Sequence, residues 1–249
     1  MARSVAQEIA DDLRDEIQSG RLAPGGLLPS ERELIARYKV SKTTVAKALA
    51  QLRAEGLLVS EVGRGVFVRS VQRLRRYGTK RHLRSGRPEG TAPLEAEAQA
   101  QGMVRERHLL EVATIPAPRE IAELLGADEG AALVVRRHVL TINGEPAQIA
   151  DSYFLASQVT GTIIAQLEQI SGGVHGELAE LLGHPQMRAV EDLIARMPTP
   201  SEAETLTLPP GTPVVELTRT IYADERPVEV TKFLFDGSRH IFTYDVPMD

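Results

Sequence analysis

The sequence predicts an α+β protein in two parts: a helical N-terminal part, and a C-terminal part in which strands are mixed with helices. Apolar residues recur at helical spacing as far as Leu52, whereas β-branched runs dominate after Gly102. The dipeptide Asn143-Gly144 joins two of these runs and is a strong hairpin signal. This arrangement favours an antiparallel sheet over a doubly wound parallel one.

The composition is that of a folded protein without cysteine chemistry. Hydrophobic residues make up 42% of the 249 positions and charged residues 25%, which is ordinary for globular domains. The absence of cysteine excludes disulfides and Cys-ligated zinc or iron–sulfur sites. The six histidines are scattered without the i, i+4 spacing of a helical metal site. We therefore expect no metal and no cofactor.

No membrane segment is predicted. No apolar run reaches the roughly 18 residues that a spanning helix needs. The N-terminus, MARSVAQEIADDL, is acidic and amphipathic where a signal peptide would be basic and then apolar. The expected location is the cytoplasm.

Charge is divided unevenly along the chain. The net charge of -5 hides 18 Lys and Arg against 10 Asp and Glu in residues 1–90, a surplus of +8, followed by -13 over residues 91–249. A basic N-terminal part is the usual electrostatic signature of nucleic-acid binding. The two parts are therefore expected to face different partners.

The first two helices are predicted from their caps and spacing. Apolar residues recur every four positions after Ser4, a plausible N-cap, until Gly20 stops the helix. The second helix begins at Ser30, which forms a Ser-x-x-Glu capping box with Glu33, and it ends near residues 38–40.

A third helix and a β-hairpin follow. Ser41 caps the helix and Gly56 stops it. Two β-branched runs at 57–60 and 66–69 flank a glycine-containing turn at 61–65. The apolar face of the helix, spaced i, i+3, i+4, i+7, consists of Val45, Ala48, Leu49 and Leu52. Three helices and a hairpin in this order predict a winged helix-turn-helix.

The other face of the third helix carries small side chains and lysines. Lys42, Thr43 and Lys47 lie there together with Ala46, which is small enough to let the backbone approach a groove. Such a helix fits the ~12 Å wide major groove of DNA. There the lysines can reach guanine acceptors or phosphates, and Thr43 can bond a phosphate or touch a thymine methyl.

Two arginines extend this surface. Arg32 lies in the first turn of the second helix, where a phosphate would also meet the partial positive charge of the helix N-terminus. Arg64 lies between Gly63 and Gly65 at the hairpin tip, which suits a minor groove. An ordinary charged surface is the alternative, but four independent signals agree on DNA binding.

Residues 20–68, GRLAPGGLLPSERELIARYKVSKTTVAKALAQLRAEGLLVSEVGRGVFV, resemble the winged-helix signature of the GntR regulators. The family commonly has arginine where Lys42 and Lys47 stand. Because lysine lacks the bidentate fork of arginine, the base preferences of other members are not expected to carry over. The resemblance and the helix pattern together assign DNA contacts to Arg32, Ser41, Lys42, Thr43, Thr44, Lys47, Gly63, Arg64 and Gly65.

The rest of the chain divides into a linker and a sheet domain. Residues 72–94 are basic, with glycine and proline and little periodicity, so the predicted boundaries are 1–70, 71–94 and 95–249. Predicted strands cover 109–115, 132–142, 147–154, 189–197, 213–223, 228–235 and 241–246. Predicted helices cover 118–125, 159–170, 174–182 and 201–206.

Three segments in this part are similar to the UTRA effector domain of the HutC subfamily: RRHVLTINGEPAQIADSYF, RMPTPSEAETLTLPPGTPVVELTRTIY and ADERPVEVTKF. The all-helical effector domains of the FadR type have no place for so many strands. The resemblance covers roughly residues 95–246. It implies a chorismate-lyase-like fold with a six-stranded antiparallel sheet, a small effector in a pocket, and a homodimer formed largely through this part.

The sequence does not name the effector. Members that bind sugar phosphates carry an Arg-x-Arg pair before the hairpin and a glutamate after it, but the aligned positions here hold His138, Leu140 and Ala150. This departure argues against a phosphosugar. The pocket candidates are Arg137, Asp151, Tyr153, His175, Glu191, Arg196 and Glu229. A surface or salt-bridged role stays open for each, since most charged residues remain exposed.

Together these observations predict a ligand-responsive transcriptional regulator. We expect a homodimeric repressor that a small molecule releases from a palindromic DNA operator. The chain has no His-Glu-x-x-His, Gly-x-Ser-x-Gly or phosphate-cradling glycine loop, so it is not expected to be an enzyme. Two alternatives remain: an enzyme built on the lyase-like part, and a ligand-independent architectural DNA binder.

Overall fold

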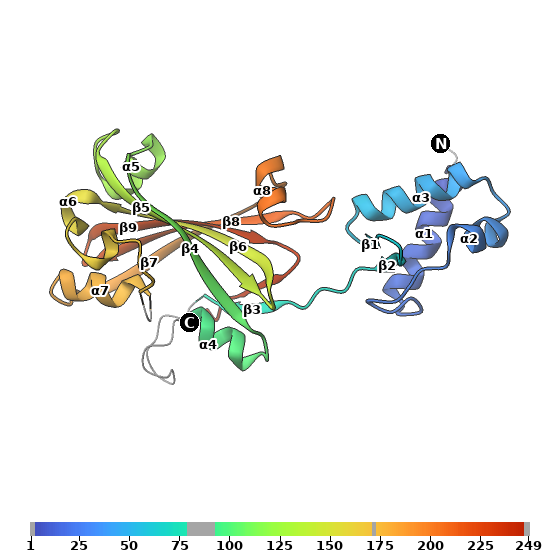
Figure 1. The fold of residues 1–249 in the computed structure, drawn as a ribbon, viewed down its shortest axis with the longest axis horizontal. Coiled ribbons are helices and arrows are strands. Elements are labelled where there is room, and N and C mark those ends of the chain that lie inside the picture. The colour runs from blue at the N-terminus through green and yellow to red at the C-terminus, as the bar shows by residue number, and fades with distance from the viewer. Residues whose placement is uncertain (1–2, 79–92, 171–172, 247–249) are drawn as a thin grey trace. The chain divides into compact units, whose positions relative to one another are not determined.

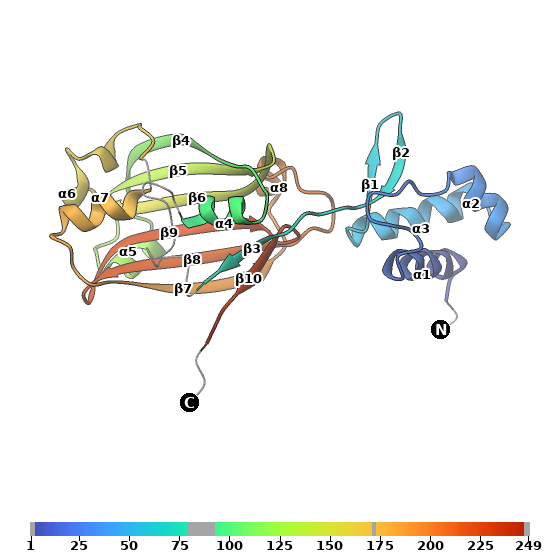
Figure 2. The ribbon, with the colours of Figure 1, turned by 90° about the horizontal axis from the view of Figure 1, so that it is seen from below.

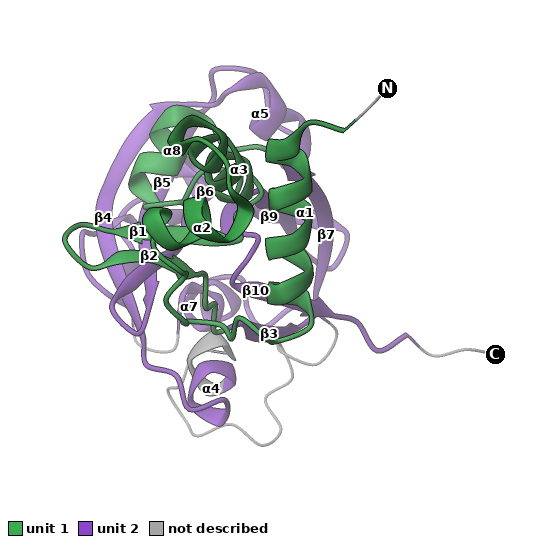
Figure 3. Ribbon diagram, turned by 90° about the vertical axis from the view of Figure 1, so that its right-hand side faces the viewer, with its two compact units in different colours: residues 1–72, 197–212 green, residues 73–196, 213–249 purple. Residues whose placement is uncertain are grey.

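The computed structural model describes residues 3–78, 93–170 and 173–246, and its elements are labelled in Figure 1. The chain divides into two compact units, coloured separately in Figure 3. One contains the residues up to 72 together with 197–212, and the other contains 73–196 with 213–249. Over the described residues no helix is long and apolar enough to cross a membrane.

The first unit contains the predicted three helices and hairpin. Its elements are α1 (Val5–Gln18), α2 (Glu31–Tyr38), α3 (Lys42–Ala54), β1 (Leu58–Glu61) and β2 (Gly65–Val68). The capping box is present, because the Ser30 hydroxyl accepts from the Glu33 amide at 3.3 Å and the Ser30 amide donates to the Glu33 carboxylate at 2.7 Å.

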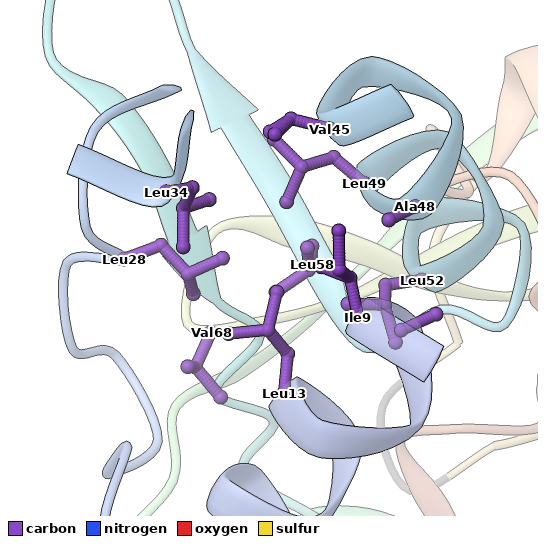
Figure 4. Packing of buried hydrophobic residues seen from close by; sticks show 11 residues of the cluster. Ile9, Leu13, Leu28, Leu34, Val45, Ala48, Leu49, Leu52, Leu58 and Val68 are labelled. Atoms are coloured by element: carbon purple, nitrogen blue, oxygen red, sulfur yellow. The ribbon is translucent and has the colours of Figure 1, made fainter. Parts of the chain in front are cut away.

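One apolar core holds these elements together. The buried face of α3 packs against Ile9 and Leu13 of α1 and against Leu34 of α2, and Leu58 and Val68 of the hairpin close the cluster (Figure 4). Each fully buried leucine or isoleucine contributes roughly 1.5–3 kcal/mol relative to an exposed one. This core fixes which face of α3 points outward.

The hairpin is braced by the segment before α2, a contact that the sequence did not indicate. The Gly25 amide donates to the Val68 carbonyl at 2.9 Å, and the Leu28 amide donates to the Val66 carbonyl at 2.8 Å. Leu27 forms an isolated antiparallel bridge with Phe67. The glycines and prolines of residues 24–29 therefore form a third line of backbone along the wing.

The second unit is built on a six-stranded antiparallel sheet of order β4-β5-β6-β9-β8-β7. The β5–β6 hairpin turns at Asn143 and Gly144, which both have positive φ (52° and 82°), as a type I′ turn requires. The strands are β4 (Arg105–Pro116), β5 (Ala132–Ile142), β6 (Glu145–Leu155), β7 (Met187–Arg196), β8 (Val214–Ala223) and β9 (Arg226–Asp236).

Helices cover both faces of this sheet. Helix α5 (Arg119–Leu125) packs on one face, against Leu133, Val135 and Tyr153. The other face is covered by α6 (Ala156–Val159), the 3-10 turn η1 (Ile163–Ala165) and α7 (Val174–Leu181) (Figures 1 and 2). We call these the α5 face and the α7 face.

The predicted linker over 71–94 is not irregular throughout. Within it, β3 (Leu74–Tyr77) pairs in parallel with the last strand, β10 (His240–Thr243), and α4 (Pro93–Ala100) begins at its end. The buried Arg76 guanidinium lies 4.6 Å from the Phe235 ring centroid, which anchors β3 to the sheet. Residues 79–92 of the predicted linker lie outside the described residues.

The predicted helix over 159–170 is wrong. Only α6 and the three-residue η1 are helical there, separated by Gly161 with φ of 83°. The Arg136 side chain donates to the carbonyls of Ile164, Gln166 and Glu168 at 2.7, 2.8 and 2.7 Å. Tertiary hydrogen bonds thus replace the intrahelical ones. The predicted helix at 201–206 is α8 (Pro200–Thr205), which belongs to the first unit.

Candidate DNA-binding surface and effector site

The outward face of α3 is polar, cationic and free of bulky apolar groups. Lys42, Thr43, Ala46 and Lys47 are all exposed, and every residue of the opposite stripe is buried. The Lys42 ammonium lies 3.9 Å from the Glu31 carboxylate, but 78% of the lysine side chain is exposed, so this pair constrains it little. The lysines therefore remain available to an anionic partner.

Ser41 and Thr44 shape the start of this helix. The Ser41 hydroxyl accepts from the Thr44 amide at 3.2 Å and shares a 2.9 Å hydrogen bond with the Thr44 hydroxyl. Thr44 is half-buried, whereas Ser41 is exposed. Both side chains are thus engaged in capping, and the first amides of α3 form an exposed, partly positive helix end of the kind that binds phosphate.

The wing presents Arg64 on a narrow tip. Gly63 and Gly65 have φ of 75° and 121°, in the region that favours glycine, and a Cβ on Gly65 would lie 2.9 Å from the Leu27 side chain. Arg64 is exposed, contacts Glu61 and lies 5.4 Å from the Phe67 ring centroid. Arg32 is also exposed, in the first turn of α2. The predicted DNA-contacting residues are therefore all at least partly accessible, in one unit.

The seven predicted effector residues do not lie together. Side chains alternate between the faces of a sheet, and the register places Arg137, Asp151, Tyr153 and Arg196 on the α5 face. Glu191 and Glu229 point to the α7 face, where His175 of α7 contacts Glu229. A single pocket can contain only one of these sets.

The set on the α5 face is engaged in ion pairs. Arg137 contacts Glu111 at 2.5 Å and Asp151 at 3.3 Å, while Arg196 contacts Glu216 at 2.8 Å. Burial raises the pKa of Asp151, and Arg137 opposes that effect. Burial likewise raises the pKa of Tyr153 to about 12. These partly exposed pairs fit the surface role that the sequence left open.

The set on the α7 face includes a buried charge cluster. Glu229 is 2% exposed, with its carboxylate 3.1 Å from the His175 ring and 3.8 Å from the Arg219 guanidinium. The Thr231 hydroxyl donates to the Glu229 carboxylate at 2.6 Å and bonds the Ser152 hydroxyl at 2.8 Å. Three strands, β6, β8 and β9, and helix α7 therefore contribute polar groups to one region.

Electrostatics keep Glu229 ionised. Burial would raise its pKa, but His175, Arg219 and the Thr231 hydroxyl outweigh burial and lower the pKa to about 2. Burial lowers the pKa of the neighbouring Arg219, and Glu229 opposes that effect. The 3.8 Å gap between the two charged groups exceeds a direct hydrogen bond, and the buried Arg219 Nε has no hydrogen-bond partner among the described residues. Such a pair is suited to a polar ligand.

Sequence reasoning missed several residues of this face. Arg219 and Thr231 were not predicted. Arg136 was not predicted either; it is the neighbour of the predicted Arg137 in β5, but its side chain lies on the α7 face. His138 also lies there and is 7% exposed, and burial together with the charges of Arg107 and Arg136 lowers its pKa to about 4. The alternation of β5 was the available signal, because Arg136 and Arg137 must face opposite ways.

A surface depression at the β8–β9 turn lies apart from this cluster. It is lined by Leu182, Pro185, Ala223, Asp224, Glu225, Arg226 and Pro227. None of these residues belongs to the buried charge cluster, so the depression is not the site described above.

The first unit is a winged three-helix unit with a cationic recognition helix, and it is joined to a sheet domain with a buried polar cluster. This combination defines a DNA-binding regulator. Family models match both parts: bacterial regulatory proteins of the gntR family over residues 5–68 and the UTRA domain over residues 100–241. The chain belongs to the GntR family and carries a UTRA domain, consistent with its HutC-type regulators.

Curated relatives are similar over nearly the whole chain. An uncharacterized HTH-type transcriptional regulator of Streptomyces coelicolor is 30% identical, with 96% of this chain and 91% of that protein covered. The HTH-type transcriptional repressor NagR of Bacillus subtilis is 27% identical (95% and 92%). The histidine utilization repressor of Pseudomonas putida is 28% identical (90% and 85%). Because such relatives are named regulators or repressors, the chain is a regulator rather than an enzyme.

Solved structures support the fold. A crystal structure of a GntR-family transcriptional regulator matches with a TM-score of 0.65 at 29% identity, covering 99% of both chains. PhnF from Mycobacterium smegmatis matches with a TM-score of 0.57 at 24% identity over 99% of this chain and all of that chain. The second similarity concerns the fold alone.

Proposed function

We propose that this protein is a homodimeric repressor that binds a palindromic operator through α3 and is released by a small molecule. The exposed face of α3 carries the proposal, because its cations and small residues suit a major groove. In this proposal Lys42, Thr43 and Lys47 contact bases or phosphates. Arg32 and the α3 N-terminus hold the backbone, and Arg64 reaches the minor groove. Its expected location remains the cytoplasm.

The effector is proposed to bind on the α7 face, at His175, Glu229 and Arg219, with Glu191 at the same face. Glu229 and Arg219 offer a buried acceptor and a buried donor, so the expected ligand is small and carries both hydrogen-bond donors and acceptors. Arg137, Asp151, Tyr153 and Arg196 are not retained in this proposal, because they lie on the opposite face.

Switching is proposed to act through the relative placement of the two DNA-binding units of the dimer. The recognition helices α3 of the two copies, related by a two-fold axis, would enter successive major grooves about 34 Å apart. An effector that weakens operator binding must itself bind less tightly to the DNA-bound protein, by the same factor. Equal effector affinity with and without operator DNA would exclude this mechanism.

The DNA-binding proposal is tested by selecting bound sequences from a random duplex pool with purified protein at moderate salt. The expected result is enrichment of a two-fold symmetric motif. Retained binding without enrichment would mean that the basic unit only coats phosphates, and the architectural alternative would then be favoured.

The effector site is tested by a thermal-shift screen of small amino acids, amines, carboxylates and sugars. A ligand that prefers the folded state raises the unfolding temperature. The expected hit stabilises the wild type but not Glu229→Gln, and an Arg137→Gln control on the α5 face keeps the response. If stabilisation by the ligand were lost in Arg137→Gln but kept in Glu229→Gln, the site would lie on the α5 face, and the proposed site on the α7 face would be contradicted.

A further inference from the structure

The outer side of β7 has the features of an interface strand. β7 is an end strand of the six-stranded sheet, and its ten residues pair with β8 without a bulge. Among the strands that the structure describes, none pairs with its other side. Val190, Leu193 and Ile194 are 41%, 39% and 59% exposed. A long, regular edge with exposed apolar side chains is a template for another strand.

The other edge of the sheet is protected in a way that β7 is not. In β4 the register shifts between Leu109 and Glu111, which marks an irregularity, and the preceding residues 105–108 are all charged or histidine. Bulges and charges blunt edge strands, as do proline and lysine. Four of the ten residues of β7 are also charged, but β7 contains neither proline nor lysine and, unlike β4, pairs with its neighbour without a register shift. The two edges of the same sheet therefore differ in their readiness to accept a partner.

We propose that β7 pairs antiparallel with β7 of a second copy of this chain, so that the two sheets join across a two-fold axis. The inference rests on the proposed dimeric function and names the strand that forms the dimer. An edge pairing with its own copy is an isologous contact, which closes the assembly at two copies and leaves no open edge on that side.

Symmetry restricts the register. Residues opposite each other in an antiparallel pair point to the same face, so under a two-fold axis perpendicular to the sheet one residue must oppose its own copy. A centre at Glu191 or Asp192 would place two carboxylates opposite each other. The Asp192 centre would also oppose Arg188 with Arg196. Like charges directly opposite are destabilising.

A centre at Val190 avoids these conflicts. It places Arg188 opposite Asp192 of the partner copy twice, once on each side of the axis, and likewise Met187 opposite Leu193. Seven residues, 187–193, then overlap within β7. A centre at Leu193 would overlap as many residues but would oppose Asp192 to Ile194 and gain no charge pair. A centre at Ile194 would also oppose opposite charges, Asp192 and Arg196, but only the five residues 192–196 would overlap. Charge complementarity and the length of the overlap together therefore select Val190 as the central residue.

Single-cysteine cross-linking tests the register, because the chain has no cysteine of its own. In Val190→Cys the two Cα atoms would be about 4.5–5.5 Å apart, a distance that a disulfide spans. Ile194→Cys is the control: it is more exposed, but its two copies would be eight residues apart, about 27 Å at ~3.4 Å per residue. Val190→Cys should form disulfide dimers at least tenfold faster under mild oxidation. Equal or faster cross-linking of Ile194→Cys would overturn the register.

Charge reversal gives a second test by sedimentation equilibrium. Asp192→Arg would oppose two arginines on each side of the axis and should weaken association about tenfold. Adding Arg188→Asp to it should restore dimerisation, despite the loss of the 3.1 Å contact between Arg188 and Glu225. A double variant as weak as Asp192→Arg would contradict the proposed pairing.

The outcomes separate this inference from the proposed function. A wild-type chain that stays monomeric at all concentrations would contradict both the dimer and its interface. A dimeric wild type whose Val190→Cys variant does not cross-link would contradict the interface alone and leave the proposed operator binding intact.

Discussion

At the scale of residues, the functional assignment depends on which way a side chain points. The core under α3 leaves Lys47 exposed, and the alternation of β5 turns Arg136 and Arg137 to opposite faces. The sequence allowed the first conclusion, because apolar residues at helical spacing mark the buried side. The sequence shows that Arg136 and Arg137 face opposite ways, but not which of them faces the effector site. A sheet that is covered on both faces has apolar residues on both, so the apolar pattern does not distinguish the faces.

Lys47→Ala should lower affinity for the selected duplex by roughly 5- to 150-fold, the cost of one base-edge contact of about 1–3 kcal/mol. It should also relax the sequence preference at one position of each half-site. Arg21→Ala, which removes an exposed cation just after α1, is the matched control. Fluorescence anisotropy at fixed salt measures both. Equal affinities of the two variants would show that α3 is not the recognition helix.

Arg64→Ala should weaken binding to a similar degree across different sequences, because a wing cation contacts the backbone or a minor groove. The slope of log affinity against log salt should become shallower by about 1. Binding titrations at four salt concentrations measure this slope. An unchanged slope would mean that the wing does not contact DNA.

His138 should make the second unit acid-sensitive. Its folded pKa is lowered to about 4 by burial and by nearby arginines, whereas an unfolded histidine titrates near 6.5. The unfolded state therefore binds the proton first, and stability is lost as pH falls from about 6.5 towards 4, by up to about 1.4 kcal/mol per pH unit. His138→Gln removes this component. Chemical denaturation between pH 7 and 4 should show the wild type losing its advantage over the variant; a constant difference would contradict the assignment.

At the scale of elements, most helices and strands follow from caps and periodicity, and the main failure is instructive. Residues 159–170 have apolar residues at a spacing that resembles a helix, yet Gly161 interrupts the backbone and Arg136 binds three carbonyls of the segment. A long-range contact from β5 thus decides the local structure. The brace of the wing by residues 25–28 is equally invisible in the sequence, because backbone hydrogen bonds leave no residue pattern.

Arg136→Met should therefore loosen one segment. The carbonyls of Ile164, Gln166 and Glu168 would lose their donor, at a cost of about 1–3 kcal/mol for each that stays buried. Amide exchange in residues 160–170 should accelerate at least tenfold. Arg137→Met, from the other face of the same strand, is the control and should change exchange there little. Similar exchange in both variants would show that Arg136 does not hold the segment.

At the scale of the whole molecule, the basic part of the sequence contains the gntR-family match over residues 5–68. The acidic part contains the UTRA match over residues 100–241. The number of parts followed from the sequence, but their membership did not. Residues 197–212 leave the sheet after β7 and belong to the first unit, and Leu74–Tyr77 pair with the last strand. Contacts between segments so distant along the chain have no local signal.

In the proposed complex, two copies of the chain recognise two half-sites with α3. The most direct measurement is the stoichiometry and affinity of the complex with the selected duplex, determined by sedimentation, beside a duplex in which one half-site is scrambled. We expect two chains on the intact duplex and at least a tenfold loss of affinity on the scrambled one. One chain per duplex, with equal affinity for both DNAs, would contradict the proposed complex.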